Sequence, residues 1–303
     1  MSEAERQIKS CQPPDPNTKQ PQFAMPQGAC DAHCHVFGPA DKFPYDPGRS
    51  YTPPDAPRER LKALHDLLGV ERAVIVQASC HGADNTAALD AIAHSQGKYR
   101  GVAIVDESYT DKDYEDMHAG GMRGVRFNFV AHLGGTPDLE FLKKTVDRIR
   151  PLGWHLVLHL DAKDILEFED LFKSLSITIV IDHMGRVDAS AGLDQKPFQT
   201  LLEFAENENY WIKVCGSERI SKEGPPFLDA VPYARKLVET APDRMIWGTD
   251  WPHPNIKGTM PNDGDLVDLV GRFAPEPEFH QKLLVDNPAR LYGFEPVPVG
   301  QEA

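Results

Sequence analysis

Short apolar segments alternate with amphipathic ones along most of the chain. Eight short segments are rich in apolar residues and predict buried strands: 29–36, 72–79, 100–106, 124–129, 154–161, 177–183, 211–215 and 244–250. Segments with helical spacing separate or follow these strands: 58–69, 84–96, 111–119, 138–150, 164–174, 196–207, 228–240, 264–272 and 277–284. Strands that alternate with helices in this way predict a parallel sheet.

Eight such units favour a (β/α)8 TIM barrel of the metal-dependent hydrolase type, a fold that usually needs about 250 residues. A doubly wound open sheet is the alternative. Polar residues follow most of the predicted strands, and only a barrel brings all strand ends to one mouth. We expect an N-terminal arm over 1–27, a single domain over 28–295 and a tail over 296–303. The proline-rich segment 38–57 predicts a long functional loop without regular structure.

Charge and composition narrow the function classes. The 303 residues carry a net charge of -14, from 46 acidic and 32 basic side chains. Such a surface argues against nucleic acid or an acidic membrane as a partner, but it leaves a small anionic substrate open. We expect no signal peptide and no membrane span, because 1–22 is polar and no apolar run approaches about 20 residues.

Cysteine usage indicates a reducing compartment. The five cysteines are odd in number and form no Cys-x-x-Cys pair: Cys11, Cys30, Cys34, Cys80 and Cys215. This usage predicts a cytoplasmic protein without a disulfide framework. A monomer or a small homo-oligomer is compatible with the sequence.

Four histidines and one aspartate follow the predicted strands. His33 and His35 are two residues apart on a strand, so both side chains point to one face. His159, His183 and Asp250 come at the ends of the fifth, sixth and eighth strands. Each alone is more simply a buried core residue, but five at equivalent barrel positions favour a site. Catalytic zinc needs about three such ligands and one open position, and an aspartate beside it can take a proton from water.

Longer motifs around these residues carry a resemblance. They are Asp31 to Gly38, Val76 to Gly82, Gly121 to Phe129, Val180 to Arg186 and Ile246 to Pro254. The set resembles the amidohydrolase superfamily, and the motifs look like those of the 2-pyrone-4,6-dicarboxylate lactonases. The resemblance covers residues from about 25 to 293.

The resemblance implies a hydrolase of carboxylic esters of the lactone type. It makes Asp250 the activator of water and places His183 with His33 and His35 around the lactone carbonyl. It further implies that Arg126 and Arg219 bind anionic groups of the substrate. Three more residues are expected to line the pocket: Tyr51, Ser79 and His81. A surface salt bridge is the simpler explanation for an arginine, but Arg126 lies within an apolar strand.

Two positions depart from the pattern of the dicarboxylate lactonases. His159 stands where they have tyrosine, which restores a ligand of the wider superfamily. We therefore expect one Zn²⁺ per chain on His33, His35, His159 and Asp250. His132 stands where they have a further arginine, so one carboxylate anchor in the substrate site is weakened. Both departures favour a sulfonated relative of the substrate, 4-sulfomuconolactone, which would be opened to maleylacetate and sulfite.

Three alternatives stay open. The first is hydrolysis of 2-pyrone-4,6-dicarboxylate without a metal. The second is a decarboxylase of the same superfamily, in which the metal holds a substrate oxygen. The third is a non-catalytic binding protein on the same fold, although intact polar residues at five strand-end positions argue against it.

Overall fold

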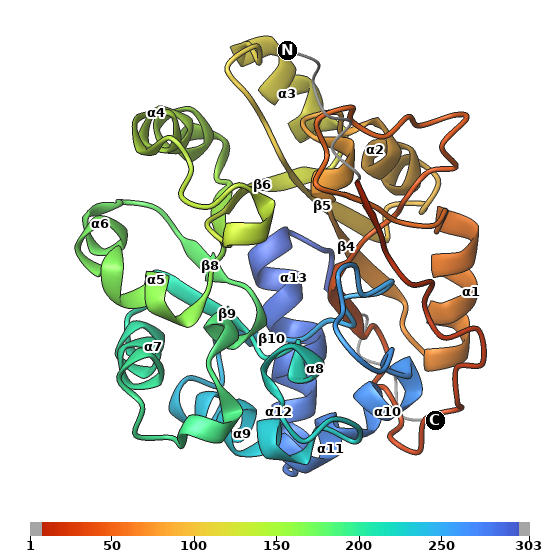
Figure 1. Cartoon of the computed structure of the whole chain (residues 1–303), viewed down its shortest axis with the longest axis vertical. Coiled ribbons are helices and arrows are strands. Elements are labelled where there is room, and N and C mark those ends of the chain that lie inside the picture. The colour runs from red at the N-terminus through yellow and green to blue at the C-terminus, as the bar shows by residue number, and fades with distance from the viewer. Residues whose placement is uncertain (1–7, 297–303) are drawn as a thin grey trace, which may run out of the picture.

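The structure is a computed structural model that describes residues 8–296, so 1–7 of the arm and 297–303 of the tail lie outside it. Its main sheet has eight parallel strands, one for each predicted strand (Figure 1). In sheet order these are β2 (Cys30–Cys34), β4 (Arg72–Val76), β5 (Tyr99–Ala103), β6 (Met122–Asn128), β7 (His155–His159), β8 (Ile179–Ile181), β9 (Tyr210–Lys213) and β10 (Met245–Ile246).

Backbone hydrogen bonds between the first strand and the segment after the last one close the sheet. The Ala32 N–H donates to the Trp247 carbonyl at 2.8 Å, and the Asp250 N–H donates to the His33 carbonyl at 2.7 Å. The His35 N–H donates to the Trp251 carbonyl at 2.8 Å. The predicted barrel is therefore confirmed, and the open sheet is excluded.

A ring of helices surrounds the barrel (Figure 1). The α-helices are α1 (Arg58–Leu68), α2 (Thr86–Ala93), α3 (Asp111–Ala119), α4 (Leu139–Ile149), α5 (Ala162–Glu167), α6 (Glu169–Ser174), α7 (Lys196–Glu206), α8 (Ser217–Ile220), α9 (Val231–Thr240), α10 (Asp263–Asp268), α11 (Val270–Phe273), α12 (Pro277–Gln281) and α13 (Asn287–Tyr292). Among residues 8–296, none of the helices is long and apolar enough to cross a membrane.

The helix predictions hold with a few differences. The predicted helix 164–174 is two helices, α5 and α6, and the predicted helix 264–272 is also two, α10 and α11. The short helix α8 and the last helix, α13, were not predicted. The proline-rich segment contains a short strand, β3 (Tyr51–Thr52), that pairs with β1 (Lys9–Ser10) of the arm. The described part of the arm thus packs on the surface of the barrel, next to the mouth.

A separate apolar cluster fills the inside of the barrel. Its members come from nearly every strand: Cys30, Ala32, Val74, Val76, Val102, Val157, Val180, Trp211 and Ile246, with Tyr292 and Phe294 from the end of the chain. Tyr292 and Phe294 bring the end of α13 against this cluster, and α13 lies at the centre of Figure 1. This packing closes the barrel at the end away from His33 and His35.

An irregularity in β2 determines where its histidines point. Cys30 and Ala32 face the inner cluster, so regular alternation would turn His33 outward. The pairing with β4 shifts register between Asp31 and Cys34, which is the signature of a bulge. As a result His33 and His35 also face inward, as the two-residue spacing required.

One further histidine lies deep in the barrel and gives a test of its burial. The ring of His155 is 5.0 Å from that of Tyr292, and burial lowers the His155 pKa to about 3. Since an unfolded histidine titrates near 6.5, the unfolded chain binds more protons below that pH, and stability falls as the pH falls. Between pH 6.5 and pH 5 we expect a loss of about 2 kcal/mol from this residue.

Thermal or urea unfolding at pH 7 and pH 5 checks this expectation. The matched variant His155→Phe keeps a ring but cannot titrate, so its stability should fall less over the same interval. An equal fall in the wild type and the variant would contradict the assignment.

Candidate active site

Four side chains converge at the mouth of the barrel. The Asp250 Oδ1 atom is 3.2 Å from His35 Nε2, 3.5 Å from His33 Nε2 and 3.9 Å from His183 Nε2. All four residues are buried, with at most 2% of each exposed. The structure therefore brings together a carboxylate oxygen and three imidazoles that come from three different predicted strands.

Unusual backbone conformations aim two of these side chains. His183 has φ of 50° and Asp250 has φ of 64°, which is the left-handed region that residues other than glycine rarely adopt. The sixth strand ends at Ile181, two residues earlier than predicted, so His183 begins a 3₁₀ turn, η4 (His183–Arg186). Such conformations cost roughly 1–3 kcal/mol each and cluster at functional sites.

Arg219 holds the second oxygen of Asp250. Its Nε and Nη2 atoms donate to Asp250 Oδ2 at 2.8 and 2.6 Å, and its Nη1 donates to the Pro254 carbonyl. Burial alone would raise the pKa of the Asp250 carboxyl, but the Arg219 guanidinium holds it well below its usual range. Asp250 is therefore ionised, and its Oδ1 is the oxygen left toward the histidines.

A second buried group of charges supports Arg219 from behind. Glu218 Oε1 is 3.5 Å from Arg219 Nε and 3.7 Å from His253 Nδ1, while His253 Nε2 is 3.0 Å from Asp263 Oδ1. Burial alone would lower the pKa of His253, but Asp263 raises it to about 10. His253 is thus a buried cation between two carboxylates. None of these three residues was predicted to have a functional role.

Beneath His33 lies a third network, which the sequence also did not reveal. Lys213 Nζ is 3.0 Å from His33 Nδ1 and 3.1 Å from Asp182 Oδ1, and Arg126 Nε donates to Asp182 Oδ2 at 2.9 Å. Lys213 and Asp182 are fully buried. The sequence does contain one indication of this network: Lys213 lies inside the apolar strand Trp211–Cys215, and buried lysines are rare unless they are paired.

A small cavity of about 30 Å³ lies above these side chains. Its lining contains most of the predicted pocket residues: His35, Tyr51, Ser79, Arg126, His132, His159, His183, Arg219 and Asp250. Arg186 also lines it and was not predicted; its Nε donates to Asp161 at 2.8 Å. Three arginines therefore face one cavity, which favours an anionic ligand.

An outer vestibule of about 390 Å³ adjoins the cavity and shares His132, Arg186, Arg219 and Asn255 with it. Three lysines line the vestibule: Lys9, Lys222 and Lys257. The protein is acidic as a whole, so this concentration of cations at the mouth would attract small anions toward the cavity.

His81 has a different position from the one expected. Its Nδ1 is 3.1 Å from the Pro44 carbonyl, and its Nε2 accepts from the Gly38 N–H at 3.3 Å. His81 is buried and is not part of the cavity lining described above. Its contacts fix the proline-rich segment 38–57 beside the mouth.

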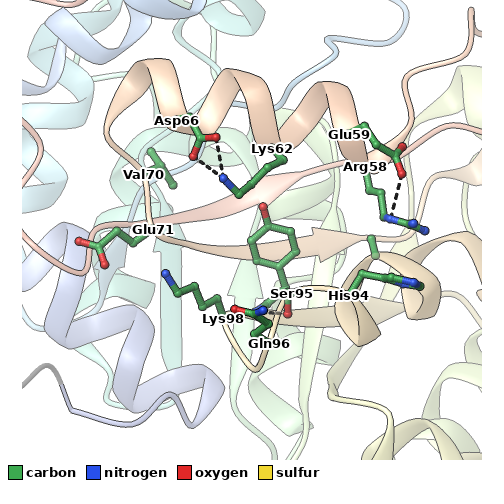
Figure 2. Close-up of a pocket in the computed structure, with 12 residues that line it drawn as sticks. Arg58, Glu59, Lys62, Asp66, Val70, Glu71, His94, Ser95, Gln96 and Lys98 are labelled. Carbon is green, nitrogen blue, oxygen red and sulfur yellow. Dashed lines mark hydrogen bonds and ion pairs between the residues drawn. The ribbon is translucent and has the colours of Figure 1, made fainter.

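Another cavity, of about 480 Å³, lies away from the mouth against α1 (Figure 2). Charges of both signs line it, and several pair with one another, as Lys62 does with Asp66 at 2.6 Å and Arg58 with Glu59 at 3.1 Å. It contains none of the converging histidines. The chemistry therefore belongs to the smaller cavity at the barrel mouth.

Comparison with known proteins agrees with this geometry. The Amidohydro_2 family, described as amidohydrolase, matches residues 30–294. The chain belongs to the amidohydrolase family. A 2-pyrone-4,6-dicarboxylate hydrolase of Comamonas testosteroni is 51% identical over 93% of this chain and 95% of the relative. A 4-sulfomuconolactone hydrolase of Rhizobium radiobacter is 44% identical over 94% of this chain and 97% of the relative.

Solved structures share the fold. The crystal structure of an Acinetobacter baumannii protein with citric acid bound has a TM-score of 0.77 and 26% identity, covering 88% of this chain and 100% of that one. The names of the relatives confirm the predicted enzyme class, a hydrolase that opens lactones. The predicted resemblance to this group of amidohydrolases is confirmed as well.

Amidohydrolases often bind a metal, and part of the expected ligand set fits one here. One nitrogen each of His33 and His35 and one oxygen of Asp250 lie within 4.8 Å of one another, and His33 Nε2 is buried without a hydrogen-bond partner. The three-ligand requirement of catalytic zinc is met by these atoms. His159 is not in this group: its Nδ1 is 2.9 Å from Asn128 Oδ1, and its ring is 5.5 Å from that of His183.

The position of Asp250 gives a direct test of the site. Asp250→Asn keeps the shape but removes the charge and the basic oxygen, so the turnover of lactone should fall by roughly 10²- to 10⁴-fold. Steady-state kinetics measures the loss, and circular dichroism checks the fold. The control Asp243→Asn alters an exposed carboxylate that pairs with Lys282 and should be nearly silent. Near-normal turnover in Asp250→Asn would remove this residue from the mechanism.

Proposed function

We propose that this amidohydrolase opens a small lactone that carries two anionic groups and arises in the breakdown of aromatic compounds. The observation that carries the proposal is the placement of Asp250 Oδ1 among three imidazoles, directly beside a cavity lined by Arg126, Arg186 and Arg219. The first set can activate water at a carbonyl, and the second can hold carboxylate or sulfonate groups.

The substrate occupies both parts of the mouth. The inner cavity of about 30 Å³ is smaller than a lactone ring, so the ring extends into the vestibule of about 390 Å³. Its anionic groups pair with the guanidinium groups, whose forked donors suit carboxylate and sulfonate oxygens. Tyr51 and Ser79, whose hydroxyl oxygens are 3.4 Å apart, supply neutral hydrogen bonds on the same wall.

Asp250 Oδ1 accepts the proton as a water oxygen forms its bond to the lactone carbonyl carbon. The carbonyl π electrons move to oxygen, and the resulting oxyanion needs a hydrogen-bond donor. Burial lowers the pKa of His183 to about 4, so its ring is neutral. With the Cys215 thiol 3.4 Å from its Nδ1, His183 can present Nε2–H to the oxyanion. The ring C–O bond then breaks, and the departing oxygen takes up the proton.

Substrate binding itself increases the basicity of Asp250. Without substrate, Arg219 makes two hydrogen bonds to Asp250 Oδ2, which keeps the carboxylate a weak base. An anionic substrate group that engages Arg219 competes for those donors. The pKa of Asp250 then rises, so the base becomes effective when the substrate is in place.

A metal ion held by His33, His35 and Asp250 would supply Lewis-acid polarisation of the carbonyl and a lowered pKa for water. Zinc would be the metal best suited to this donor set, because imidazole and carboxylate are ordinary ligands of zinc. His183, Arg126 and Arg219 keep the same binding and orienting roles with the metal bound.

The first candidate substrate is 4-sulfomuconolactone. His132 and His159 face the cavity as neutral rings, since partial desolvation lowers the pKa of His132 and burial lowers that of His159. This arrangement gives less support to a planar dicarboxylate than a cation at position 132 would. Ring opening leaves one carbon that bears both oxygen and sulfonate; as its C–S bond breaks, sulfite leaves with the electron pair and a carbonyl forms, giving maleylacetate.

The second candidate substrate is 2-pyrone-4,6-dicarboxylate. It is favoured by the 51% identity to the Comamonas testosteroni hydrolase, which exceeds the 44% identity to the 4-sulfomuconolactone hydrolase. Arg186 also supplies a guanidinium near position 132 that the sequence alone did not place there.

A side-by-side assay separates the two substrates. At equal enzyme concentration, we expect stoichiometric sulfite release from 4-sulfomuconolactone and slow loss of the ultraviolet absorbance of the pyrone. Asp250→Asn serves as the inactive control for both reactions. Fast pyrone loss without sulfite release would promote the second candidate, and no turnover of either would refute the proposed class.

The variant His132→Arg tests the reason for the preference. A permanent cation should add a charge-assisted hydrogen bond to the dicarboxylate, worth roughly 1.5–3 kcal/mol, so kcat/KM for the pyrone should rise about ten- to a hundredfold. The value for 4-sulfomuconolactone should change less. An equal change for both substrates would show that position 132 does not discriminate between them.

A further inference from the structure

The two histidines of β2 have different partners on their Nδ1 atoms. His35 Nδ1 is 2.7 Å from the Val76 carbonyl oxygen. A carbonyl oxygen only accepts, so His35 Nδ1 carries the hydrogen. In the neutral ring, His35 Nε2 then carries no hydrogen, and its lone pair faces Asp250 Oδ1, which is 3.2 Å away. His35 is thus prepared to bind a cation at the centre of the site.

His33 carries its hydrogen on the opposite ring nitrogen. Its Nδ1 is 3.0 Å from Lys213 Nζ, and an ammonium group has three donors and no acceptor. His33 Nδ1 must therefore accept, and in the neutral ring the hydrogen is on Nε2. That hydrogen lies on the side of the ring that faces Asp250, whose Oδ1 is 3.5 Å from the nitrogen but makes no hydrogen bond with it.

Asp182 could also bind His33 Nδ1, as an acceptor of its hydrogen, but this carboxylate already pairs with Lys213 and Arg126. Its Oδ1 is 3.3 Å from His33 Nδ1 but 3.1 Å from Lys213 Nζ, and Arg126 Nε donates to its Oδ2 at 2.9 Å. Two buried cations thus neutralise this carboxylate. Lys213 therefore contacts both the Asp182 carboxylate and the His33 ring. Its contact with His33 Nδ1, at 3.0 Å, is shorter than that of Asp182 Oδ1 with the same atom, at 3.3 Å, so Lys213 determines which nitrogen of His33 is protonated.

We propose that Lys213 is a positioning residue that fixes His33 as the Nε2–H tautomer and so weakens metal binding at His33, His35 and Asp250. A zinc ion would have to displace the hydrogen that His33 presents to Asp250, because a metal-binding nitrogen must be deprotonated. The mouth then favours activation of water by Asp250 alone. The inference concerns the site of the proposed function, but its tests below require no substrate.

The variant Lys213→Met tests the inference by zinc titration. Methionine has a similar length and no donor, so His33 Nδ1–H can turn to Asp182 Oδ1 and Nε2 becomes a free ligand. Partners of this kind typically change metal affinity by roughly 10- to 100-fold. We therefore expect isothermal titration with zinc chloride on chelator-treated protein to give a Kd at least about tenfold lower than that of the wild type.

A matched control separates the hydrogen bond from the charge. Arg126→Met removes a buried cation from the same Asp182 but leaves the contact between Lys213 and His33 in place. Its zinc affinity should change less than that of Lys213→Met. An equal gain in both variants would mean that lost positive charge, rather than the tautomer, controls the metal, and would overturn the proposal.

Histidine ¹⁵N NMR of the metal-free wild type tests the tautomer without any change at Lys213. The His33 signals are assigned by their loss in His33→Gln. They should show Nε2 protonated and Nδ1 free, and His35 should show the reverse. A His33 ring protonated at Nδ1 in the wild type would overturn the proposal even if Lys213→Met fails to fold.

Discussion

The buried carboxylate of Asp31 ties the first strand of the barrel to the segment after the last one. Its Oδ1 accepts from the N–H groups of His33 and Thr249, both at 3.0 Å, and its Oδ2 accepts from the Thr249 hydroxyl at 2.6 Å. Gly248 allows the close approach, since a Cβ there would lie 2.4 Å from His33 N. Because this seam is fixed, the histidines of β2 stand directly opposite Asp250.

Charged side chains lie at several levels of the barrel mouth, from the buried floor to the outer vestibule. Lys213 and Asp182 lie beneath His33, Arg219 lies beside Asp250, and lysines surround the outer vestibule of a protein whose net charge is -14. Every buried charge named at the site has a partner, as the cost of removing ions from water requires. Cations outnumber carboxylates along the path of an entering anion, and Arg219, which pairs with Asp250, is also available to that anion.

Much of the fold and of the site could be predicted from the sequence, because both depend on local patterns. Apolar runs marked all eight strands, and residues at the strand ends marked His33, His35, His183 and Asp250. The partners of Lys213, Asp182 and Arg186 could not be predicted, since they lie on segments far apart in the chain. The bulge in β2 was hidden too, because the two-residue spacing of the histidines gives the same orientation either way.

In the reaction that we propose, water activated by Asp250 attacks the carbonyl carbon of a lactone. Hydrolysis in H₂¹⁸O, followed by mass spectrometry of the product, tests it most directly. One ¹⁸O atom should appear in the carboxylate formed from the lactone carbonyl. The carbon that bore the ring oxygen should carry none when its carbonyl is trapped by immediate borohydride reduction, before it exchanges oxygen with the water. Label at that other carbon, or the absence of any labelled product from either candidate lactone, would contradict the account.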